Sequence, residues 1–95
     1  MQKRHDDLLT NRLEKILTEG SVYISWQELY LWYGVKALAA RTYRDLSNRW
    51  SELSIDYTKH DGTELGKLMF VQSPGKPSPG IFLFGENMPE PVIDE

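Results

Sequence analysis

Three side chains that could form bidentate or paired hydrogen bonds recur at helical spacing in the middle of the chain: Arg41, Arg44 and Asn48. Their spacing of i, i+3 and i+7 places them on one side of a helix. An arginine fork can donate to O6 and N7 of guanine, and an asparagine amide pairs in a similar way with adenine. The other interpretation is a solvated helix face on which Asp45 forms local ion pairs with Arg41 or Arg49. The spacing by itself is compatible with hydrogen bonding to base edges, but it favours a plain solvated surface.

Positive charge gathers in this part of a chain that is acidic overall. The 95 residues carry a formal net charge of −3, yet residues 36–49 contain four bases and one acid. Lys36 and Arg49 extend the basic stretch, and Arg49 either contacts a phosphate or covers the core with its stem. Lys76 is the single base of a proline-rich loop at 73–80, where it could contact a phosphate. This distribution favours a local anionic partner over general binding to nucleic acid.

The sequence lacks the residues that catalysis and metal binding usually require. The chain has no Cys, and its two histidines, His5 and His60, lie far apart in the sequence. Disulfides, thiolate metal sites and a cysteine nucleophile are therefore excluded. No glycine-rich phosphate loop, serine nucleophile motif or suitably spaced carboxylate pair stands out, and His60-Asp61 is interpreted as a loop. We expect a protein that is not an enzyme and that needs neither metal nor cofactor.

The chain before the basic stretch predicts two helices joined by a short strand. Apolar residues at Leu9, Leu13, Ile16 and Leu17 predict a helix over 2–19 that ends at Gly20, and Val22 to Ile24 favour a strand. A capping box, Ser25-x-x-Glu28, then starts a second helix at Trp26, which Gly34 can end in the left-handed conformation. On this helix Leu31 faces away from the apolar stripe. Leu31 and Trp32 are either a dimer or partner contact or are partly covered by the first helix or the C-terminal tail.

A third helix is predicted over 37–53, with one apolar face and the basic face opposite to it. The apolar face consists of Ala39, Tyr43, Leu46, Trp50 and Leu53. Residues 54–58 could form a short extended segment, within a stretch over 54–66 that is either a strand or a long loop, and Asp61-Gly62 indicates a turn. Strands at 67–72 and 81–84 flank the proline-rich loop and predict a hairpin. We expect one α+β domain over residues 1–85 and a disordered acidic tail over 86–95.

This order of elements resembles the winged helix-turn-helix family, over about residues 5–85. The resemblance rests on Ser25-Trp-Gln-Glu-Leu29, on Gly34-Val35 in the turn, and on Ala39-Ala-Arg-Thr-Tyr-Arg-Asp-Leu46 in the third helix, with the hairpin as the wing. It implies that the third helix enters the major groove of DNA. Base edges or flanking phosphates would then face the Arg41 side of this helix, Ser25 would lie near the DNA backbone, and Lys76 would approach a phosphate or the minor groove.

The sequence therefore predicts a sequence-specific, double-stranded DNA-binding transcriptional regulator that acts as a homodimer. The alternative is a winged-helix adaptor for protein–protein interaction, or a small inhibitor protein, that does not bind DNA. No stretch approaches the roughly 18–20 apolar residues of a membrane helix. Because residues 1–7 are polar and charged, they do not resemble a signal peptide, and we expect a cytoplasmic location without membrane contact.

Overall fold

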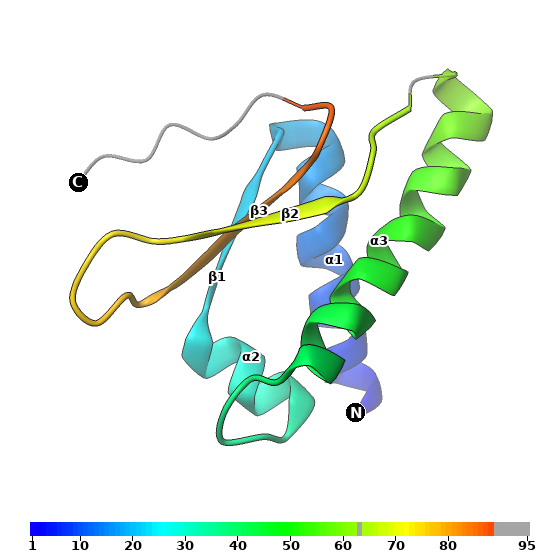
Figure 1. Ribbon diagram of the computed structural model, residues 1–95. Helices are drawn as coiled ribbons and strands as arrows, with labels where there is room; N and C mark the ends of the chain where they lie inside the picture. Colours follow the sequence, from blue (N-terminus) through cyan, green and yellow to red (C-terminus); the bar gives the residue numbers. More distant parts are fainter. Residues whose placement is uncertain (63, 89–95) are drawn as a thin grey trace.

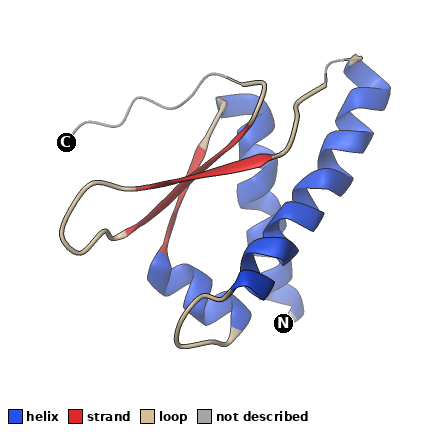
Figure 2. Cartoon of the chain, in the orientation of Figure 1, coloured by secondary structure: helices blue, strands red, loops and turns tan. Residues whose placement is uncertain are grey.

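Three helices and a three-stranded antiparallel sheet make up the described part of the chain, so the predicted α+β class is confirmed (Figures 1 and 2). The structure is a computed structural model that describes residues 1–62 and 64–88. In chain order its elements are α1 (Lys3–Glu19), β1 (Val22–Ser25), α2 (Trp26–Tyr33), α3 (Ala40–Asp61), β2 (Leu68–Gln72) and β3 (Gly80–Gly85).

The sheet has the strand order β1-β3-β2, with both pairs antiparallel. β3 is the central strand: Leu83 lies opposite Val22 of β1 on one side and opposite Phe70 of β2 on the other. The sequence did not predict that β1 joins the sheet. Gly80 permits this pairing, because a Cβ atom there would lie 2.4 Å from the carbonyl oxygen of Ile24.

The core lies between the helices and the sheet. Leu9, Leu13 and Ile16 of α1 are fully buried, as are Leu46 and Trp50 of α3. These residues belong to the apolar stripes that the sequence predicted for the two helices. The sheet adds Val22, Ile24, Ile81, Leu83 and Leu68 to the same cluster.

Local signals placed most helix ends correctly. Gly20 and Gly34 both take left-handed backbone conformations after α1 and α2, with φ of 88° and 66°. The capping box at Ser25 is complete, since its hydroxyl accepts from the Glu28 N–H while the Glu28 side chain accepts from the Ser25 N–H. Short-range hydrogen bonding is enough to fix these boundaries.

The predicted limits of the third helix are wrong at both ends. It begins at Ala40 rather than at 37, because Ala39 is extended (φ −125°, ψ 170°) and Leu38 packs against the core from the connection. Ala39 is exposed and therefore does not belong to the apolar face. The connection from Gly34 to Ala39 is thus longer than a tight turn.

At its other end α3 continues through the segment that was predicted to be extended. Tyr57, one turn beyond Leu53, also packs against the core, so the apolar face persists. His60 and Asp61 belong to the last turn of the helix rather than to a loop. Gly62, with φ of 77°, ends it in the left-handed conformation, where the Asp-Gly pair had indicated a turn.

The segment that follows β3 contacts the chain just before β2. The Glu86 N–H donates to the Lys67 carbonyl oxygen and the Asn87 N–H to that of Leu65, while Met88 packs against the core. These contacts include the first three residues of the predicted tail, and residues 89–95 lie outside the described part of the chain. Within that part, none of the helices combines the length and the apolar composition needed to cross a membrane.

Candidate nucleic-acid interface

The predicted base-reading residues lie together on the open face of α3. Arg41, Arg44 and Asn48 are all exposed. Within the described residues none of their side chains forms an ion pair or a hydrogen bond. Lys36 is also exposed and lies in the connection before the helix. The helix therefore presents uncompensated positive charge over its first two turns, together with amide and guanidinium donors.

Arg49, predicted to be a further DNA contact, is instead engaged inside the protein. Its Nε donates to Asp45 Oδ2 at 2.8 Å, and its Nη1 forms an ion pair with Asp6 of α1. Tyr33 of α2 donates its hydroxyl to the same Asp45 oxygen at 2.7 Å. The network joins all three helices, so the main role of Arg49 is to hold α3 against α1 and α2.

The network also sets the protonation of its members. Burial acts to raise the pKa of Asp45, but the hydrogen bonds from Arg49 and Tyr33 outweigh it and lower the pKa below its usual value. Burial and the bond to Asp45 raise the pKa of the Tyr33 hydroxyl. Tyr33 therefore stays protonated as a donor, and Asp45 stays charged at neutral pH.

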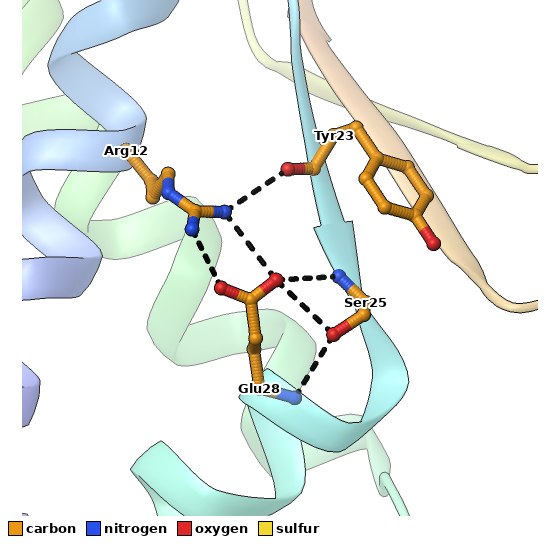
Figure 3. A network of polar contacts seen from close by, with 4 residues as sticks. All are labelled: Arg12, Tyr23, Ser25 and Glu28. Atoms are coloured by element: carbon orange, nitrogen blue, oxygen red, sulfur yellow. Dashed lines mark hydrogen bonds and ion pairs between the residues drawn. The ribbon is translucent and has the colours of Figure 1, made fainter.

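A second network fixes α2, as Figure 3 shows. Arg12 of α1 forms an ion pair with Glu28 at 2.6 Å and donates to the carbonyl oxygen of Tyr23 in β1 at 3.2 Å. Glu28 also accepts from the backbone N–H of Ser25. Burial acts to raise the pKa of Glu28, but the Ser25 N–H and the Arg12 side chain lower it. The hydroxyl and the backbone N–H of Ser25 are thus both used to cap the N-terminus of α2.

The two predicted partner residues occupy different environments. Leu31 is 63% exposed, in agreement with its position off the apolar stripe, but Trp32 is only 4% exposed and belongs to the core. The guanidinium of Arg12 lies 5.5 Å from the centre of its ring. The packing of α2 against α1 buries the indole, so Trp32 offers little surface to a partner, and Leu31 is the exposed residue of the two.

The proline-rich loop is anchored at its base by the start of α2. Trp26 donates its indole N–H to the Ser78 carbonyl oxygen at 2.8 Å, and its backbone N–H to that of Pro79 at 3.1 Å. Lys76 is exposed near the tip of the loop. The anchor joins the loop to the helix that precedes α3, although the two are far apart in the sequence.

An open pocket of about 260 Å³ lies where α2, the connection and α3 meet. Its lining residues are Tyr33, Val35, Arg41, Thr42 and Asp45. Of these, only Arg41 was predicted to be a site residue. Tyr33 packs against the core from α2. Thr42 lies one and two helical turns before the buried Leu46 and Trp50, and this spacing is the signal in the sequence that could have indicated its burial.

No family model, curated protein or solved structure matches this chain. Among the described residues, no group of three or more histidine or acidic side chains is placed to hold a metal ion.

Proposed function

We propose that this chain is a winged-helix domain that binds double-stranded DNA in a sequence-specific manner and regulates transcription. The observation that carries the proposal is the exposed set of Arg41, Arg44 and Asn48 on one face of α3, with no partner for their side chains in the described part of the chain. Side chains of these types supply the donors that distinguish guanine and adenine in the major groove. The element order of helix, strand, two helices and two strands supports the same proposal.

The charge distribution along α3 indicates which end of the helix enters the groove. The helix has 22 residues and is about 33 Å long. Its first half carries Arg41 and Arg44, whereas Glu52 and Asp56 are exposed in its second half. Phosphates repel these carboxylates, so the N-terminal half would approach the bases while the C-terminal half points away.

Two further bases would contact the DNA backbone on either side of this half-helix. Lys36 precedes α3 in the connection, and Lys76 lies on the loop anchored by Trp26. An ammonium group gives a phosphate contact without reading sequence. In this arrangement α3 supplies specificity, and the lysines supply affinity that depends on salt.

The first test is fluorescence anisotropy with a pool of labelled duplex DNA at about 50 and 200 mM salt, the range in which phosphate contacts weaken. Arg44→Ala should weaken binding by about 5- to 150-fold, the effect of losing one base contact worth about 1–3 kcal/mol. Arg4→Ala is the matched control, because it removes the same charge from an exposed position on α1. If the wild type does not bind at about 10 μM and the lower salt, the proposal is wrong.

A protein partner is the second candidate, and exposed apolar side chains at the N-terminus and on α1 and α2 favour it. Met1 is 52%, Leu8 48% and Leu31 63% exposed. Met1 and Leu31 line one shallow hollow together with His5, and Leu8 follows His5 by one helical turn. The partner could be a second copy, as a dimeric regulator requires.

Leu31→Glu should then abolish the dimer in sedimentation velocity and leave binding of one DNA half-site intact. An adaptor without DNA affinity would instead show no binding in the anisotropy test.

A further inference from the structure

The first turn of α3 lacks the groups that usually complete a helix N-terminus. Its N-cap residue, Ala39, has no side chain able to accept a hydrogen bond, and the turn contains no acidic residue. Within the described residues, the backbone N–H groups of Ala40 and Arg41 have no acceptor. The helix dipole concentrates partial positive charge at such an end. An acceptor or an anion would stabilise it.

Thr42 supplies a second and independent observation at the same end. It is only 5% exposed, yet its hydroxyl forms no hydrogen bond with the described part of the chain. In that part, no polar side-chain atom that is fully shielded from solvent lacks a partner. The Thr42 hydroxyl is therefore open to solvent in part, and Thr42 lines the pocket. A hydroxyl that is open to a pocket and has no protein partner is available to donate to a ligand there.

The rest of the pocket is compatible with an anion. Arg41 lines it, and its guanidinium group has no ion-pair partner among the described residues. Asp45 also lines it, but Asp45 Oδ2 already accepts from Arg49 and Tyr33, and Arg49, which also pairs with Asp6, offsets part of the carboxylate charge. Val35 and Tyr33 complete the lining.

We propose that this pocket binds a phosphate group, held by the Arg41 guanidinium, the Thr42 hydroxyl and the free N–H groups at the start of α3. Phosphate matches a guanidinium fork and the N-terminus of a helix in both charge and geometry. The group could belong to the DNA backbone, and this part of the inference rests on the proposed function. It could equally belong to a small phosphate ester that occupies the pocket in the absence of DNA.

Phosphate binding is tested on the full chain by titrating inorganic phosphate at constant ionic strength, with chloride as the replaced ion. Amide resonances of residues 40–42 should shift and saturate, with a dissociation constant in the millimolar range or tighter.

Thr42→Val and Arg41→Gln should each weaken binding at least fivefold. Thr42→Ser keeps the hydroxyl and should restore binding, which separates the lost donor from altered packing. Arg44→Gln removes an equal charge outside the pocket and should have little effect. Shifts that do not saturate, or that are equal in wild type and Thr42→Val, overturn the proposal.

Duplex DNA then distinguishes the two sources of the phosphate. If the group belongs to the DNA backbone, Thr42→Val weakens DNA binding at least fivefold, and inorganic phosphate competes with DNA. If it belongs to a small ester, Thr42→Val loses phosphate binding but leaves DNA binding unchanged. DNA binding without saturable phosphate shifts would reject the pocket and keep the proposed function. Saturable shifts without DNA binding would keep the pocket and reject the proposed function.

Discussion

At the scale of single residues, the indole N–H groups of two tryptophans connect helices to distant loops. Trp26 donates to the Ser78 carbonyl oxygen, and the fully buried Trp50 donates to that of Gly66 at 3.1 Å. Each indole combines a large apolar surface with one donor that needs a partner when buried. These residues therefore position the loops as well as filling space.

We expect Trp50→Phe to lower the free energy of unfolding by about 1–3 kcal/mol, because it leaves the Gly66 carbonyl without its donor and removes part of the ring. Urea denaturation followed by circular dichroism measures the change. Trp26→Phe is the control, since Trp26 is only half-buried and its loss should cost less. An equal loss for the two variants would contradict this role for Trp50.

At the scale of elements, two glycines are required for different physical reasons. Gly34 ends α2 at positive φ, and an added Cβ atom there would have no neighbour within 4 Å. Gly80 lies where β1 meets β3, and its Cβ atom would lie 2.4 Å from the Ile24 carbonyl oxygen and 2.8 Å from the Ser25 Cα atom. Gly34 is therefore required by its backbone conformation, whereas Gly80 is required because there is no room for a Cβ atom between the two strands.

Gly80→Ala should therefore destabilise the protein more than Gly34→Ala. The change at Gly34 adds about 1–2 kcal/mol of backbone strain. The change at Gly80 forces two strands apart, with a cost of about 3 kcal/mol or more and weaker pairing of β1. Thermal unfolding shows which of the two variants is less stable. Hydrogen exchange of the β1 amides tests whether the Gly80→Ala change weakens the pairing of β1. If the β1 amides of Gly80→Ala exchange as slowly as those of the wild type, the close contact between residue 80 and Ile24 is refuted.

At the scale of the whole molecule, two ion-pair networks hold α1 in place. Arg12 connects it to Glu28 at the start of α2, and Asp6 connects it to Arg49 of α3. The carboxylates of Glu28 and Asp45 both have lowered pKa values in the folded protein. Folding is therefore coupled to proton binding at two contacts between helices.

The free energy of unfolding should consequently fall as the pH drops below about 4.5, the ordinary value for the Glu28 carboxyl. Folding lowers the pKa of both carboxyls, so their contribution is present above the unfolded pKa and is lost as each one is protonated in the folded state. Glu28→Gln should make the acid limb of the stability curve shallower. Glu14→Gln, at an exposed position on α1, should not change it. Urea unfolding at a series of pH values measures both slopes, and identical slopes would exclude the Glu28 contribution.

Much of the local structure follows from the sequence by itself. The apolar spacing of Leu9, Leu13 and Ile16, the capping box at Ser25 and the glycine at 34 act within one or two helical turns. Such interactions are set by neighbours in the chain, so they can be predicted before the fold is known. The exposed positions of Arg41 and Arg44 agree with the same periodicity.

Only the tertiary structure decides features that depend on distant partners. Trp32 is buried because α1 packs against α2, and β1 joins the sheet because Gly80 admits it. Arg49 is engaged with Asp6, a residue 43 positions away in the sequence. Thr42 is buried on the same helix face as Leu46 and Trp50, so its burial follows the helical period, but the tertiary structure decides that its hydroxyl has no partner among the described residues. Sequence spacing defines a helical face, whereas packing over long sequence distances decides what that face meets.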